Sequence, residues 1–102
     1  MQRDDIIAKL RAHEPELRAA GVETLALFGS FARGDNDQGS DVDIFMRLEE
    51  RVYRGGFAYF GQLDTLIRRL SDILGKPVDI VAEPIQKERL RREIEEDRIV
   101  AF

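Results

Sequence analysis

Two features between residues 27 and 45 are suited to binding a polyphosphate. Gly29 and Ser30 end an apolar run, and glycine lets the chain turn sharply out of a strand into a helix. The first amides of such a helix point free N–H groups at an anion. Asp41 and Asp43 follow, and carboxylates are the hard oxygen ligands that magnesium binds. In this order and spacing, the two features predict a site for a metal-bound triphosphate.

The paired acids are predicted to share one face of a strand. Asp41 and Asp43 are two residues apart, so both side chains leave the same side of an extended chain. Like charges this close repel each other unless a cation lies between them. The alternative is one turn residue followed by one solvated strand residue. Val42 and Ile44 argue against it, because burying them fixes the direction of the acids.

A third acid, Asp79, lies within the apolar segment KPVDIVAE. A carboxylate among such residues is costly unless it is paired or bound to a metal. An edge-strand position facing solvent explains this residue equally well on its own. Taken together, the three acids predict two magnesium ions that clamp attacking and leaving oxygens ~3.5–4 Å apart. Asp79 would then help to deprotonate an acceptor hydroxyl.

Three polar residues near the glycine turn are candidates for binding phosphate. Ser30 and Arg33 are three residues apart and therefore lie on one side of a short helix. We expect Ser30 both to cap this helix and to offer its hydroxyl and amide to the terminal phosphates. Arg33 either stabilises phosphate charge or braces the loop. Ser40 either bonds a phosphate oxygen or caps the turn before the acids, and the sequence leaves this choice open.

Rival sites are excluded by the residues that they would need. A calcium loop of EF-hand type counted from Asp35 requires glycine at the position of Ser40 and glutamate at that of Met46. His13 is the only histidine, so no histidine-based triad or zinc site can form. The absence of cysteine excludes disulfides and thiolate ligands.

The composition predicts one globular domain over residues 1–102. Hydrophobic residues make up 43% and charged residues 35% of the chain, which fits a folded protein in water. The net charge of -4 argues against direct binding of nucleic acid. The acidic N-terminus does not resemble a signal peptide, and no apolar stretch is long enough to span a membrane. We therefore expect a cytoplasmic protein.

The order of predicted elements gives an α/β (α+β) arrangement with a small sheet and helices packed on it. Strands are expected at 22–28, 40–48 and 78–82. Helices are expected at 3–19, with a break near His13–Glu14, and at 30–33, 59–74 and 84–96. Residues 49–58 are expected to form a loop and residues 99–102 an apolar tail.

Aromatic residues surround the Gly55–Gly56 pair, at Phe57, Tyr59 and Phe60. Such side chains can contact an adenine ring or a partner protein. More often they anchor a loop to the core, and this is the expectation here.

The combined motif resembles the nucleotidyltransferase superfamily of DNA polymerase beta type. GSFARG at 29–34, SDVD at 40–43 and VDIV at 78–81 resemble most closely the stand-alone minimal nucleotidyltransferases, the MNT or MntA-like group. The resemblance implies the nucleotidyltransferase fold with a mixed sheet. It places Gly29, Ser30 and Arg33 in the phosphate-binding signature. It makes Asp41 and Asp43 the paired metal ligands and Asp79 the third carboxylate.

The same resemblance implies an activity and a partner. Members of the group are typically paired with a helical HEPN RNase toxin, which the minimal transferase neutralises as its antitoxin. The implied reaction is magnesium-dependent transfer of AMP from ATP to a tyrosine of the toxin. Two alternatives remain: a non-catalytic nucleotide-binding module that inhibits its partner by complex formation, and a small-molecule nucleotidyltransferase. We expect the acceptor to come from another chain, since 102 residues leave no room for an acceptor-binding domain.

Overall fold

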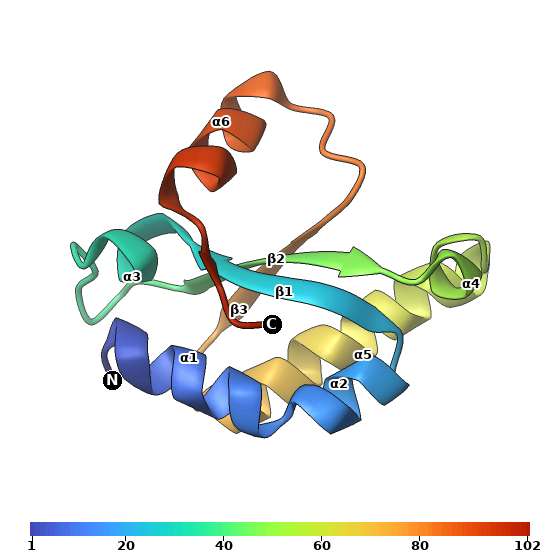
Figure 1. Cartoon of the computed structure of the whole chain (residues 1–102), viewed down its shortest axis with the longest axis horizontal. Coiled ribbons are helices and arrows are strands. Elements are labelled where there is room, and N and C mark those ends of the chain that lie inside the picture. The colour runs from blue at the N-terminus through green and yellow to red at the C-terminus, as the bar shows by residue number, and fades with distance from the viewer.

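The strands pair into one mixed sheet of order β3–β2–β1–β4 in the computed structural model, which describes residues 1–102 (Figure 1). β1 (Val22–Phe28) lies antiparallel to both β2 (Val42–Leu48) and β4 (Ile99–Val100). β2 runs parallel to β3 (Val78–Ala82), which forms one edge of the sheet. The mixed sheet expected from the sequence is therefore present.

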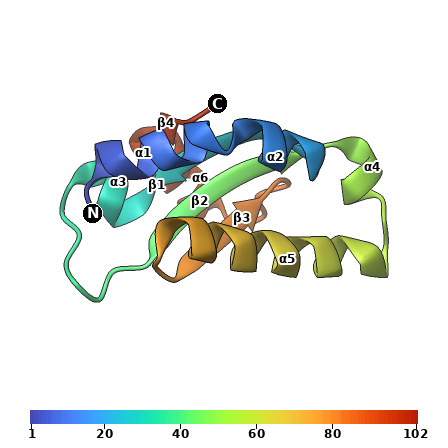
Figure 2. The same ribbon diagram turned by 90° about the horizontal axis from the view of Figure 1, so that it is seen from below.

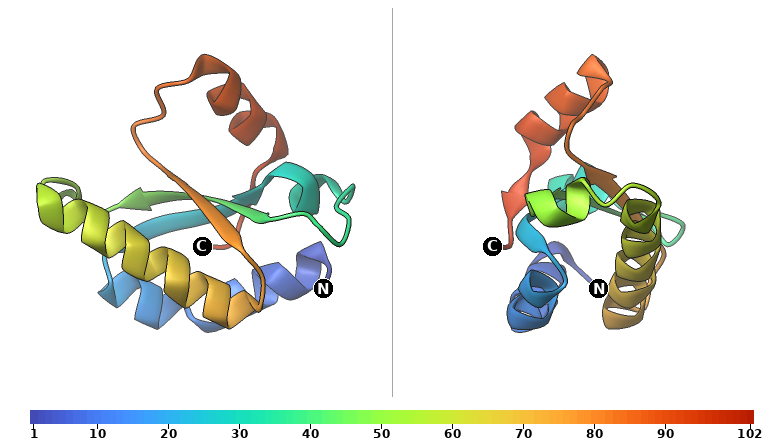
Figure 3. Two further views of the ribbon diagram at one scale, coloured as in Figure 1. Left: turned by 180° about the vertical axis from the view of Figure 1, so that it is seen from behind. Right: turned by 90° about the vertical axis from the view of Figure 1, so that its right-hand side faces the viewer.

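Six helices surround the sheet unequally. They are α1 (Arg3–Ala12), α2 (Glu14–Ala19), α3 (Gly29–Arg33), α4 (Glu50–Tyr53), α5 (Phe57–Leu74) and α6 (Glu88–Asp97). Figure 2 shows α1, α2 and α5 covering one face of the sheet, and Figure 3 shows α6 on the opposite face. None of the helices combines the length and apolar character needed to cross a membrane.

The core lies between the sheet and the three-helix face. Val42, Ile44 and Met46 are fully buried there, as the alternation along β2 requires. On the other face a smaller cluster contains Ala26, Phe28, Phe45 and Ile94. Ile94 is the buried residue of α6, so α6 is attached to the sheet through this small cluster.

The predicted break in the first helix is confirmed. Pro15 lies in the first turn of α2, where its missing N–H removes no internal hydrogen bond. The predicted bounds of β1 and β3 match the structure, and β2 begins at Val42 instead of Ser40.

Three expectations about connecting segments are wrong. The loop after β2 contains α4, and α5 begins at Phe57. α6 begins at Glu88 instead of Pro84, because Ile85 packs against the small cluster and residues 85–87 stay irregular. The apolar tail forms β4, whose Ile99 and Val100 pair with Leu27 and Ala26 of β1.

Candidate active site

The glycine turn and the second acid are in direct contact. β1 ends at Phe28, which pairs with Asp43 of β2. Gly29 then starts α3 with a φ of +76°, a backbone conformation that side chains disfavour. A Cβ built on Gly29 would overlap the Asp43 carboxylate. Glycine is therefore required both for the turn and for the space that Asp43 occupies.

Asp43 and Asp79 lie opposite each other in the parallel register of β2 and β3. The preceding pair, Val42 and Val78, is buried in the main core, so both aspartates leave the other face of the sheet. Asp79 is exposed on an edge strand and is also a neighbour of Asp43, so its role as a metal ligand stays a prediction. Asp41 lies just before β2 and is exposed.

Asp43 carries the most perturbed carboxylate of the chain. Its pKa is raised to about 6, first by its partial burial and then by the negative charges of Asp79, Glu93 and Asp41. Arg33 acts weakly in the opposite direction. The negative charges of three neighbouring acids thus act on Asp43 near the start of β2, and a cation would relieve this repulsion.

The sequence analysis missed Glu93. It lies among alternating charges in α6, a pattern typical of a solvated helix face. The packing of Ile94 against the sheet and the contacts of Arg33 with α6 bring this face of the helix toward Asp43. No signal in the sequence could have identified it.

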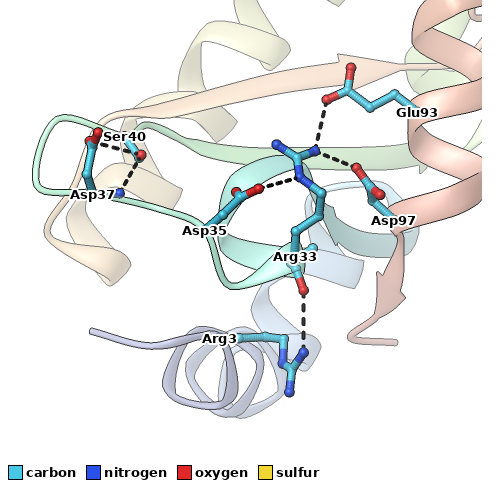
Figure 4. A network of polar contacts seen from close by, with 8 residues as sticks. Arg3, Arg33, Asp35, Asp37, Ser40, Glu93 and Asp97 are labelled. Atoms are coloured by element: carbon cyan, nitrogen blue, oxygen red, sulfur yellow. Dashed lines mark hydrogen bonds and ion pairs between the residues drawn. The ribbon is translucent and has the colours of Figure 1, made fainter.

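Arg33 is held by carboxylates on two sides (Figure 4). Its Nε donates to Oδ2 of Asp35 at 3.0 Å, and its Nη1 donates to Oδ2 of Asp97 at 2.7 Å. Nη1 also lies 3.5 Å from Oε1 of Glu93. The hydrogen bonds to Asp35 and Asp97 raise the pKa of Arg33, which stays charged. In this arrangement Arg33 braces α3 against α6.

The two serines have different surroundings. No side chain caps α3, whose N-cap residue is Phe28, so the prediction that Ser30 caps the helix is wrong. The Ser30 carbonyl instead accepts hydrogen bonds from the amides of Gly34 and Asp35. Ser40 Oγ accepts from the Asp37 amide at 2.9 Å and donates to Asp37 Oδ1 at 3.2 Å, so Ser40 closes the polar turn (Figure 4).

Comparison with known proteins assigns the family. The model of the nucleotidyltransferase domain matches residues 7–101. The chain belongs to the nucleotidyltransferase family. Its expected fold is thereby borne out, as is its assignment as an enzyme that transfers a nucleotide.

Relatives of this nucleotidyltransferase include archaeal proteins of similar length. MJ1379 of Methanocaldococcus jannaschii, named as a candidate protein adenylyltransferase, is 37% identical over 92 residues that cover 88% of both chains. The protein adenylyltransferase MntA of Thermococcus cleftensis is 33% identical, covering 89% of this chain and 87% of MntA. The chain is thus similar along most of its length to proteins named for AMP transfer to proteins.

Solved structures agree on the fold. A structure described as a candidate minimal nucleotidyltransferase superposes with a TM-score of 0.73 and 29% identity, covering 97% of this chain and 95% of that one. A chain from the complex of a tri-AMPylated HEPN toxin of Shewanella oneidensis with its MNT antitoxin superposes with a TM-score of 0.54. It is 19% identical and matches 98% of this chain and 68% of that chain, which shows the fold alone.

The acids of this nucleotidyltransferase fit a divalent cation by their chemistry. All are oxygen donors, and the raised pKa of Asp43 reflects first its partial burial and then the neighbouring negative charge, which a cation would offset. No three His, Cys, Asp or Glu side chains already surround a common point at binding distance. The ligands would therefore have to converge when the metal and the polyphosphate bind together.

Proposed function

We propose that this nucleotidyltransferase moves AMP from ATP onto a tyrosine hydroxyl of a HEPN-family toxin and neutralises that toxin as its antitoxin. The observation that carries the proposal is the contact of Gly29 with Asp43, which in turn lies opposite Asp79. A turn suited to binding an anion then lies beside two neighbouring acids. The relatives named as protein adenylyltransferases support a protein acceptor, and the AMPylated HEPN toxin found with an MNT antitoxin supports the kind of partner.

In this proposal the start of α3 holds the polyphosphate. The first amides of the helix and the Ser30 hydroxyl bind the phosphates that depart as pyrophosphate. Arg33 approaches the same phosphates by exchanging one of its carboxylate partners for a phosphate oxygen. Ser40 serves the site by holding the turn that leads to Asp41.

In this proposal the acids bind the metal ions and accept the proton of the acceptor hydroxyl. Asp41, Asp43 and Asp79 would hold two magnesium ions, which supply charge neutralisation for the phosphates and the attacking oxygen. The acceptor oxygen forms a bond to the α-phosphorus while the bond from that phosphorus to the pyrophosphate oxygen breaks. In this proposal Asp79 takes the hydroxyl proton, and its exposure beside Asp43 supports that role. We place this reaction in the cytoplasm, where ATP and magnesium are abundant.

The test is transfer to the product of the gene adjacent to the one that encodes this chain, which the proposal expects to be a HEPN-family protein. With labelled ATP and magnesium, the wild-type chain is expected to add AMP to that protein, as shown by intact mass and loss of its RNase activity. EDTA, Asp41→Ala and Asp43→Ala are expected to abolish the added mass, while circular dichroism shows that both variants remain folded. Inhibition of the RNase without added mass would favour a non-catalytic binding module. AMP transfer to a hydroxylated small molecule alone would favour the third function.

A further inference from the structure

A cluster of aromatic side chains lies exposed where α4 passes into α5. Phe57 is 97% exposed, Phe60 68% and Tyr53 45%. Tyr59 contacts the rings of Tyr53 and Phe60 edge-on, with centroid distances of 5.7 and 5.4 Å. Only Tyr59 packs against the core, so the expectation that these aromatics anchor the loop is wrong for Phe57 and Phe60. Exposed aromatic patches of this kind mark interaction surfaces.

Gly61 adds a second feature to the same patch. It lies inside α5 beside Phe60, and a Cβ built there would meet no other atom within 4 Å. Its φ is not positive, so neither its backbone nor any packing within the chain requires glycine. Glycine inside a helix lowers helix stability relative to other residues. Because Gly61 has no side chain, the backbone of another helix can approach α5 closely beside the exposed aromatic side chains.

The patch is continuous with a groove on the face of the sheet that carries the acids. Tyr53 lines this groove of about 600 Å³ together with Phe45, Leu48 and Ile94. Phe45 and Asp43 are two residues apart on β2 and leave the same face. Figure 1 shows α4 and the start of α5 at one end of the sheet and α3 at the other. The groove therefore extends from the aromatic patch toward Asp43.

Length and charge identify the kind of ligand. From Asp43 to Leu48 the strand extends ~17 Å, a distance that about five residues of an extended polypeptide span. Four glutamates and three arginines line the groove, namely Glu23, Glu50, Glu83, Glu95, Arg47, Arg91 and Arg98. A nearly balanced lining lacks the positive excess that a nucleic acid backbone requires. It is suited to a polypeptide with mixed charges.

We propose that Tyr53, Phe57, Phe60 and Gly61 form the docking surface for an α-helix of the acceptor protein, whose acceptor segment then follows the groove to Asp43. The identity of the acceptor rests on the proposed function. The surface itself is assigned from the exposure of its aromatic residues, from the absence of a side chain at Gly61 and from its continuity with the groove. The partner helix contributes apolar side chains that cover the two phenylalanines.

The test measures binding without nucleotide. The probe is the product of the adjacent gene, expected from the proposed function to be a HEPN-family protein, titrated by calorimetry. Phe57→Glu and Phe60→Glu are each expected to weaken binding at least ~10-fold, as loss of a central aromatic contact does. Ala8→Glu is the control, because Ala8 is exposed on α1, a different helix that belongs neither to the aromatic patch nor to the groove. It is expected to bind as the wild type does.

Gly61→Leu separates docking from folding. In the free chain this side chain enters open space and replaces glycine with a good helix former, so the thermal midpoint is expected to rise. The same side chain blocks the close approach of a partner helix, so binding is expected to weaken. Greater stability with weaker binding cannot result from misfolding.

Failure of this proposal is distinguishable from failure of the proposed function. Wild-type binding by the Phe57, Phe60 and Gly61 variants, or no binding by the wild-type chain, overturns the docking surface. A wild-type chain that forms dimers broken by Phe57→Glu, as measured by light scattering, also overturns it, by assigning the patch to a second copy. Phenylalanine-dependent binding without AMP transfer supports the surface and refutes the transferase proposal.

Discussion

The Asp43 carboxylate occupies the space beside the Gly29 Cα where any other residue would carry its Cβ. This contact joins the end of β1 to the middle of the acid cluster. It fixes the distance between the amides of α3 and the carboxylates, because both are placed by the pairing of Phe28 with Asp43. A phosphate bound to the amides of α3 would therefore lie beside the carboxylates.

Gly29→Ala is predicted to destabilise the fold more than Gly34→Ala does. Both glycines have positive φ, so both substitutions share a backbone penalty of ~1–2 kcal/mol. Only the Gly29 variant also overlaps Asp43, which adds ~1–3 kcal/mol, whereas a Cβ at Gly34 meets nothing within 4 Å. Urea denaturation of the two variants measures the difference. Equal losses would mean that the contact with Asp43 relaxes without cost.

The raised pKa of Asp43 predicts a pH dependence of stability in the absence of divalent cations. The pKa of the folded carboxyl is about 6, against an ordinary value of 3.8, so between these pH values the folded state keeps a proton that the unfolded state has released. This contribution is complete below about pH 4 and is lost as the pH rises through 6. Because Asp43 is only partly buried, solvent screening limits its contribution to the free energy of unfolding to about 1 kcal/mol.

Comparison with Asp43→Asn isolates that contribution. In EDTA, the variant is expected to gain about 1 kcal/mol over the wild type at pH 7.5 relative to pH 4. The free energies of unfolding at the two pH values, from urea titrations, give this difference. A constant difference between the two proteins across the range would show that Asp43 is not the titrating group.

Asp97→Asn tests whether Arg33 exchanges a carboxylate for a phosphate. The 2.7 Å hydrogen bond from Arg33 places its charge toward α6, and the Asp97 side chain is only 13% exposed. Removing the negative charge of Asp97 is expected to tighten binding of magnesium AMP-PNP about threefold, because one carboxylate fewer then competes with the phosphate for Arg33. Fluorescence titration measures the dissociation constant.

Two further substitutions serve as comparisons for that result. Arg33→Ala is expected to weaken the same binding, and Asp64→Asn, an exposed acid paired with Arg68 outside the site, to leave it unchanged. If Asp97→Asn and Arg33→Ala both leave the dissociation constant unchanged, Arg33 serves only to brace α6.

The sequence predicted those parts of the site that local chemistry determines. Gly29 and Asp43 each carry a strong local signal, and the strands that hold them lie between glycines or polar turns that define their ends. Glu93 and the partners of Arg33 were missed, because they depend on how α6 packs on the sheet through Ile94. The error at Ser30 has a local cause, since Phe28 and not Ser30 is the N-cap residue.

The C-terminal segment shows the same dependence on long-range contacts. Residues 99–102 are too few to read as a strand, yet β1 offers a free edge opposite β2. The Ala101 amide donates to the Leu25 carbonyl at 2.8 Å, and Arg11 Nε donates to the Ala101 carbonyl at 2.9 Å. Ala101 is thereby buried against the main core.

Ala101→Asp is therefore predicted to lower the free energy of unfolding by about 3 kcal/mol, because it places an unpaired carboxylate where the side chain is now 5% exposed. Val100→Asp is the matched control, since Val100 is 53% exposed on the adjacent position of β4. It is expected to cost less than about 1 kcal/mol. Urea denaturation measures both values. Similar losses for the two variants would mean that the C-terminal segment stabilises the fold through the hydrogen bonds of β4 and not through the burial of Ala101.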